Sequence, residues 1–195
     1  MAGGKERLSK DRDSAALAVR APVRSDGPAI ARFAAAMPPR DLLFLARDIR
    51  EPKVVEAWLA AQEQGRIASL IAVAANDAGG GEVVATIAAL SDRLSWSPHV
   101  WDIRLLVAPQ WRGQGLGRRL LDQAITAAVA GGATKLTARM TPDQAGAITL
   151  FEECGFRAEA LLLGQLRAAD GSLHDLAVLA LDPARVAARR EAFGD

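Results

Sequence analysis

Three glycines, Gly113, Gly115 and Gly117, alternate in the segment VAPQWRGQGLGRRLL, which covers residues 107–121. A leucine-rich helical pattern follows, although glycine costs a helix about 1 kcal/mol relative to alanine. The first turn of a helix has unpaired backbone N–H groups and the positive end of the helix dipole. Glycines let an anion approach these groups because no Cβ stands in the way. The segment therefore predicts a binding site for a phosphorylated ligand. Positive charge is added by Arg112, Arg118 and Arg119.

Two common phosphate-binding motifs do not fit this segment. A P-loop requires a Lys-Ser or Lys-Thr pair after its last glycine, and the segment has none. A dinucleotide-binding fingerprint requires a third glycine where Arg118 stands, and it usually opens the first βαβ unit of a chain. A glycine-rich connection that binds no ligand stays open as the alternative.

The elements that position this loop follow from apolar periodicity and from turn residues. Apolar runs and alternation predict strands, a 3.6-residue period predicts helices, and Gly, Pro, Asn and Asp separate them. The expected strands lie within residues 15–23, 67–75, 82–90, 101–107, 131–140 and, as a pair around Asp170-Gly171, 158–182. The expected helices lie within residues 25–37, 51–65, 116–130, 141–156 and 184–195.

This order of elements predicts an α/β (α+β) fold with a mixed β-sheet of about seven strands and helices on both faces. Residues 15–182 are expected to form a single domain. Residues 1–14 are expected to be a flexible tail, and residues 183–195 a C-terminal helix or tail.

Composition narrows the class of protein. The formal net charge of +1 favours neither nucleic acid nor a membrane surface as partner. Cys154 is the only cysteine, so no internal disulfide can form, and the charged first residues lack the apolar stretch of a signal peptide. We therefore expect a cytoplasmic protein, and the sequence leaves a homodimer open.

The glycine loop resembles the acyl-CoA pyrophosphate loop of the GNAT superfamily of N-acyltransferases. That family's pattern, Gln/Arg-x-x-Gly-x-Gly/Ala, is matched by Arg112, Gly115 and Gly117. The segment AITLFEECGF is similar to the family's second hallmark, a helix that ends in Gly-Phe, here Gly155-Phe156. The resemblance extends over residues 67–181.

The resemblance implies a splayed sheet and acetyl-CoA (coenzyme A) as cosubstrate. The strand before the loop would diverge from the strand after the helix, and pantetheine would pair with the backbone of the first strand. The pyrophosphate would bind the amides from Gly113 to Arg118. The implied cofactor-binding residues are Leu105, Leu106, Val107, Arg112, Gly113, Gln114, Gly115, Leu116, Gly117, Arg118, Gln144 and Phe151. No metal ligand is implied.

The catalytic residues of many relatives are missing. Their general acid is a tyrosine in a Leu-Tyr pair, which here is Leu150-Phe151, and the chain has no tyrosine. By the same resemblance, the glutamate base of the ribosomal-protein acetyltransferases is replaced by Arg139. Asp102 is the remaining candidate for a base, acting through a water molecule. The alternative is that Asp102 only pairs with Arg104 or another nearby arginine.

Other polar and aromatic residues allow a functional and a structural interpretation. Trp96, His99 and Trp101 either line the acceptor pocket or pack in a loop. Gln144 either contacts the cofactor or completes a capping box in TPDQ. For Cys154 a buried apolar role is favoured over a covalent one, and for His174-Asp175 the start of a strand is favoured over a pair.

The sequence thus predicts an N-acetyltransferase that moves an acetyl group from acetyl-CoA to a primary amine by direct attack. The balanced charge favours a small-molecule acceptor. Two alternatives remain: an enzyme that acetylates a protein or peptide, and a catalytically silent sensor that binds acyl-CoA. Because thioesters react readily with neutral amines, binding and orientation alone can supply much of the rate.

Overall fold

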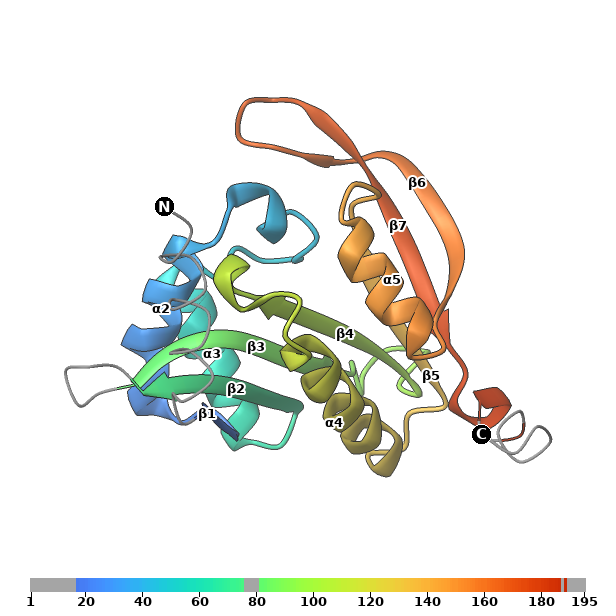
Figure 1. Ribbon diagram of the computed structural model, residues 1–195. Helices are drawn as coiled ribbons and strands as arrows, with labels where there is room; N and C mark the ends of the chain where they lie inside the picture. Colours follow the sequence, from blue (N-terminus) through green and yellow to red (C-terminus); the bar gives the residue numbers. More distant parts are fainter. Residues whose placement is uncertain (1–16, 76–80, 187, 189–195) are drawn as a thin grey trace, which may run out of the picture.

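The computed structural model describes residues 17–75, 81–186 and 188. A seven-stranded mixed sheet runs through this part of the chain in the order β1-β2-β3-β4-β5-β7-β6 (Figure 1). The strands are β1 (Leu17–Arg20), β2 (Ile67–Ala75), β3 (Gly81–Leu90), β4 (Val100–Val107), β5 (Lys135–Met140), β6 (Arg157–Arg167) and β7 (Leu173–Leu181). The predicted mixed sheet of about seven strands is confirmed.

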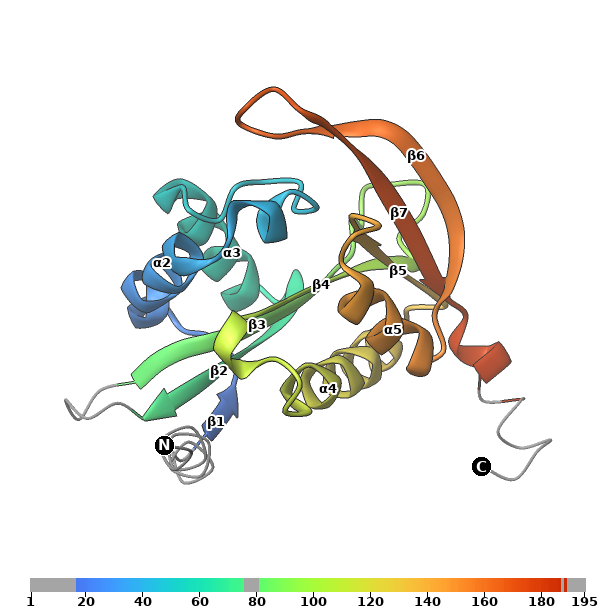
Figure 2. The same ribbon diagram turned by 45° about the horizontal axis from the view of Figure 1, so that its top comes forward.

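Helices cover both faces of the sheet (Figure 2). On one face lie α2 (Gly27–Ala36) and α3 (Pro52–Glu63), and on the other lie α4 (Leu116–Ala130) and α5 (Ala145–Glu153). Three short 3-10 turns join them: η2 (Arg24–Asp26), η3 (Pro39–Leu42) and η4 (Pro109–Trp111). Each face therefore has its own hydrophobic core.

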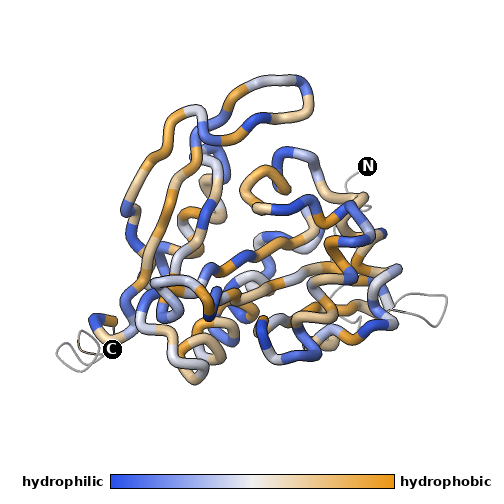
Figure 3. The backbone as a smooth tube through the Cα atoms, turned by 180° about the vertical axis from the view of Figure 1, so that it is seen from behind, coloured by the Kyte–Doolittle hydropathy of each residue, from blue (hydrophilic) through white to orange (hydrophobic). Residues whose placement is uncertain are grey.

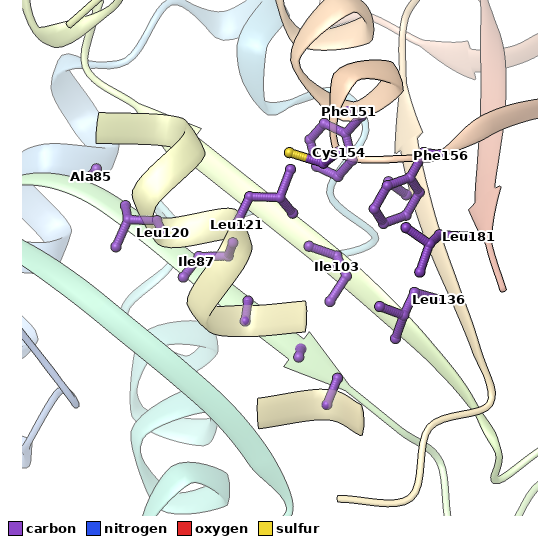
Figure 4. Close-up of a cluster of buried hydrophobic side chains, with 14 of the residues drawn as sticks. Ala85, Ile87, Ile103, Leu120, Leu121, Leu136, Phe151, Cys154, Phe156 and Leu181 are labelled. Carbon is purple, nitrogen blue, oxygen red and sulfur yellow. The ribbon is translucent and has the colours of Figure 1, made fainter. Parts of the chain in front are cut away.

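The larger core lies between the sheet and the helices α4 and α5 (Figure 4). The face of α4 that the sequence predicts as apolar is buried, at Leu116, Leu120, Leu121, Ala124 and Ala128. Burying one leucine side chain contributes about 1.5–3 kcal/mol, so this stripe holds the helix and the loop before it against the sheet. The smaller core joins α2 and α3 to β2, β3 and β4.

The pairing of β4 with β5 is short. It is the parallel pair of the sheet and covers four positions, from Val100 opposite Lys135 to Ile103 opposite Ala138. Beyond it β4 continues to Val107 along β3 only, while β5 continues along β7. The two strands therefore diverge, as the family resemblance predicts for a splayed sheet.

Several boundaries differ from the predictions. The helix expected from residue 141 begins at Ala145, because residues 141–144 form a turn closed by a bond from the Gln144 N–H to the Thr141 carbonyl, 3.0 Å. The expected tail at residues 1–14, the turn at 76–80 and most of the helix from 184 lie outside the described residues.

Hydrophobic residues also lie along the β6–β7 hairpin, which extends from the body of the protein (Figure 3). Leu161, Leu163 and Leu173 are exposed there. In the described ranges no helix combines the length and the apolar character needed to cross a membrane. The same ranges hold no cluster of side chains suited to a metal ion.

Candidate functional site

The three glycines of the loop before α4 serve two physical purposes. Gly113 and Gly115 have φ angles of 71° and 78°, in the left-handed region that disfavours L side chains. A Cβ on either residue would meet nothing within 4 Å, so open space lies in front of both. A Cβ on Gly117 would lie 3.1 Å from Leu150 Cδ2. The first two glycines therefore shape an open loop, and the third permits close packing of α4 on α5.

The backbone amides of this loop are unpaired with respect to the described part of the chain. Within the described ranges, no N–H group of residues 113–118 donates a hydrogen bond, and the first paired amide is that of Arg119, which donates to the Gly115 carbonyl at 3.1 Å. Free amides at the start of a 15-residue helix form an anion-binding site, because the helix dipole adds to their positive potential. These features suit a phosphate-like group, and the binding of one by this loop stays a prediction.

The arginines around the loop are partly neutralised. Arg112 donates from Nε to the Val107 carbonyl at 3.0 Å and pairs with Asp41. Arg118 pairs with Glu153 at 3.0 Å. These contacts tie the loop to η3 and α5.

The open edge of β4 leads away from this loop. Leu105 and Val107 pack toward α4, whereas Leu106 lies in the smaller core on the opposite face. On one side these residues pair with β3, and on the other the pairing with β5 ends at Ile103. The backbone from Arg104 to Val107 can therefore accept an extended ligand as a substitute strand.

Two further predicted cofactor residues are engaged within the protein. The Gln144 Oε1 accepts a hydrogen bond from the Thr141 N–H at 3.0 Å, which is half of the predicted capping box. Phe151 is buried and stacks edge-on against Phe156, with ring centroids 5.0 Å apart. Phe151 thus keeps a packing role and holds α5 against the sheet.

A pocket of about 290 Å³ opens on the other face of the sheet, between the loop after η3, α3 and the strands β2 to β4. Its wall is mostly apolar and includes Ile49, Trp58 and Leu90. Its polar lining consists of Arg47, Thr86 and Arg104. Sequence reasoning did not select these residues. The available signal was Arg104, a charge inside the otherwise apolar strand segment IRLLV.

Asp102 lies beside this pocket, because its cross-strand partner in β3 is Leu90. Its carboxylate accepts a hydrogen bond from Arg104 Nε at 2.8 Å, and Arg139 Nε lies 3.8 Å from its other oxygen. The Thr137 hydroxyl lies 3.4 Å from the same oxygen. The pairing that the sequence offered as the alternative for Asp102 is therefore present, and its role as a base stays a prediction.

The three residues predicted for the acceptor site do not line this pocket. Trp96 is fully exposed in the loop before β4. His99 is exposed, and its carbonyl accepts the amides of Thr134 and Lys135. Trp101 packs against the end of α4 near Gly131, on the face opposite Asp102. The structure thus gives each of them a local contact away from the pocket.

The remaining polar candidates have the structural roles that the sequence favoured for them. Cys154 is buried, and burial raises the pKa of its thiol, with a smaller contribution from Asp122. A thiol that stays protonated is a poor nucleophile, which argues against a covalent role. In β7 the Asp175 carboxylate accepts the Gly164 amide at 2.8 Å, and His174 contacts the Ser172 hydroxyl at 3.0 Å. Both contacts hold the hairpin together.

Comparison with known families agrees with this geometry. The model of the acetyltransferase (GNAT) family matches residues 35–156, which include the glycine loop, the diverging strands and both helices beside them. The chain belongs to the GNAT acetyltransferase family. This GNAT enzyme is therefore an acyltransferase, and acetyl-CoA is its acyl donor.

Solved structures share the fold. A protein from Salmonella typhimurium with its cofactor acetyl-CoA has a TM-score of 0.69 at 21% identity, covering 86% of this chain and 94% of that one. A ribosomal-protein-alanine N-acetyltransferase from Brucella melitensis has a TM-score of 0.68 at 22% identity, with coverage of 85% and 99%. A spermidine N-acetyltransferase from Vibrio cholerae, in complex with CoA and spermine, has 0.68 at 16%, with 86% and 96%. A search of curated proteins found no match.

Proposed function

We propose that this GNAT enzyme transfers the acetyl group of acetyl-CoA directly to the primary amine of a small molecule. The observation that carries the proposal is the divergence of β4 from β5 after Ile103, next to a loop whose amides at residues 113–118 are free. The open edge of β4 fits an extended pantetheine arm, and the free amides of the loop fit a pyrophosphate. The acetyl-CoA site is proposed at these two features, with the residues that the sequence predicted.

We assign the acceptor to the pocket of about 290 Å³, which lies across the sheet from α4. Arg104 and Leu106 line it, and their neighbours Leu105 and Val107 face the α4 side. An acyl group held at the open edge of β4 would therefore be reachable from the pocket. At about 290 Å³ the pocket is at the lower end of the size range for small-molecule sites, which favours a small acceptor over a folded protein surface.

The chemistry requires a neutral amine, a donor for the oxyanion and a proton for the departing thiolate. Acetyl-CoA supplies the activated thioester. For the oxyanion we propose a backbone N–H on the open edge of β4 near Val107. For the amine proton we retain Asp102, acting through a water molecule. Phe151 has no proton to donate, so the thiolate takes its proton from solvent.

Arg104 donates a hydrogen bond to one oxygen of Asp102 and the Thr137 hydroxyl donates to the other, which leaves fewer lone pairs to bind that water. A catalytic role for Asp102 therefore competes with a positioning role, in which its carboxylate holds the guanidinium of Arg104. The two roles predict different kinetic effects of the Asp102→Asn change.

The test is steady-state release of CoA thiol with acetyl-CoA and a panel of amino acids, polyamines and peptides, with mass spectrometry of the acetylated product. An acetylated small amine supports the proposal. Transfer to peptides alone would assign the enzyme to protein acetylation. Binding of acetyl-CoA without transfer to any amine would identify a sensor.

A further inference from the structure

We propose that the acceptor is an α-amino acid with an apolar side chain, whose carboxylate binds Arg104. This inference rests on the proposed transfer to a small amine and adds the chemical class of that amine. It follows from the charges that line the pocket, from the unused donors of two side chains and from the place of Arg104 in the sheet.

The pocket is positive. Arg47 and Arg104 line it, and no acidic side chain does. Asp102, which lies beside the pocket, is shared between Arg104 and Arg139. A polyamine would bring at least one additional cation into this pocket, where no carboxylate is left to pair with it. An amine that also carries a carboxylate complements the pocket.

Arg104 is placed to bind that carboxylate. Its side chain is only 25% exposed, and its Nε is used by Asp102. Its two terminal nitrogens have no hydrogen-bond partner among the described residues. A guanidinium whose Nε is already bound and whose two terminal nitrogens are free suits the two oxygens of a carboxylate.

A second polar group lies on the same side of the sheet. Thr86 lines the pocket and is 5% exposed, and its hydroxyl has no partner in the part of the chain that the structure describes. Thr86 of β3 lies opposite Leu106, and Arg104 of β4 lies opposite Ala88. Thr86 and Arg104 are therefore diagonal neighbours, each two residues from the partner of the other. Their side chains therefore share a face, and both can donate to one bound anion.

The remaining wall of the pocket is apolar, and hydrogen bonds hold the Trp58 indole in place. The Trp58 indole N–H donates to the Ser69 hydroxyl at 3.0 Å, and that hydroxyl donates to Gln62 Oε1 at 2.6 Å. Since the polar edge of the indole is already satisfied, its ring presents an apolar surface to the pocket beside Ile49 and Leu90. This wall fits an aliphatic or aromatic side chain.

The position of Arg104 aligns the amine with the chemistry. Arg104 is the first residue after the last β4–β5 pair at Ile103, so it lies where the two strands part. In an α-amino acid only one carbon separates the amine nitrogen from the carboxylate carbon. A carboxylate bound to Arg104 therefore places the amine next to the gap between β4 and β5, through which the amine must reach the acyl group.

The experiment compares L-leucine with 3-methylbutylamine, which is the same molecule without its carboxylate, and with spermidine. Acetylation is followed by CoA thiol release, and binding of each amine is measured separately by isothermal titration. For the wild-type enzyme we expect kcat/KM for L-leucine to exceed that for 3-methylbutylamine by about a hundredfold, because a buried hydrogen-bonding group is left unpaired with the amine. Arg104→Met should reduce this ratio to about one.

Arg50→Met is the matched control. Arg50 belongs to the same loop as Arg47 but pairs with Asp48 at 2.6 Å and does not line the pocket, so the ratio should not change. Arg104→Lys should keep part of the preference for L-leucine, because lysine has the positive charge of arginine but not its two terminal nitrogens. Spermidine preferred over L-leucine, or a ratio unaffected by Arg104→Met, would overturn the inference but leave the transferase standing. Binding of L-leucine without acetylation would support the pocket assignment and refute the proposed transfer.

Discussion

The loop before α4 provides the sharpest test of the acetyl-CoA site, by exchange of Gly115 for valine. Gly115 has a φ of 78°, and a Cβ there would point into open space in front of the free amides. Valine at Gly115 should therefore do two things. It should strain the backbone, and it should fill the space that we assign to the pyrophosphate.

Gly132, at the other end of the same helix, separates these two effects. It has a φ of 94°, and a Cβ there would also meet nothing within 4 Å. Valine at either position should cost about 1–3 kcal/mol of stability, because both backbones are left-handed. Only valine at Gly115 should weaken acetyl-CoA binding. Loss of two charge-assisted hydrogen bonds, at about 1.5–3 kcal/mol each, corresponds to at least a hundredfold increase in Kd.

Isothermal titration with acetyl-CoA measures the affinity, and thermal unfolding of the same samples measures the strain. The expected result is a similar fall in Tm for Gly115→Val and Gly132→Val, with weak binding in the first and wild-type binding in the second. A folded Gly115→Val protein that binds acetyl-CoA with wild-type affinity would place the pyrophosphate elsewhere and refute our use of the loop.

Three further predictions concern single side chains. If Asp102 takes the proton of the amine through a water molecule, Asp102→Asn lowers kcat about a hundredfold without changing the affinity for acetyl-CoA. If kcat stays within about threefold of wild type while KM for the acceptor rises, Asp102 instead positions Arg104. The Arg20 guanidinium beside Asp26 holds the pKa of that carboxyl below its usual value, against the effect of burial. The contribution of this pair to stability is present above the pKa of Asp26 in the unfolded chain and is lost as pH falls. Asp26→Asn should therefore lower the free energy of unfolding by about 1–2 kcal/mol at neutral pH. In denaturant titrations the difference in stability between the variant and the wild type should close below about pH 4. Because burial raises the pKa of the Cys154 thiol, iodoacetamide should label the folded protein at least about tenfold more slowly than the urea-unfolded protein; equal rates would contradict its burial.

The sequence by itself determined the elements and the anion loop. The spacing of Leu116, Leu120 and Ala124 predicts the buried face of α4, because helical periodicity is a local property of the chain. The glycines likewise predict an open loop at a helix start, since backbone freedom depends on the residue type alone. These predictions needed no knowledge of what lies across the sheet.

Only the tertiary structure decided the pocket that we propose for the acceptor. Trp58, Thr86 and Arg104 come from three elements that are far apart in the sequence, and they meet because α3 packs on β2, which is followed in the sheet by β3 and β4. No local pattern encodes which strand face a distant helix will cover. The predicted residues Trp96 and Trp101 illustrate this, because their neighbourhood in the sequence suggested a pocket, whereas the fold exposes one and packs the other behind the sheet. Asp102 had two interpretations from sequence. Its pair with Arg104, two residues along the same strand, was one of them, whereas its contact with Arg139 depends on the register of β4 with β5, which periodicity does not specify.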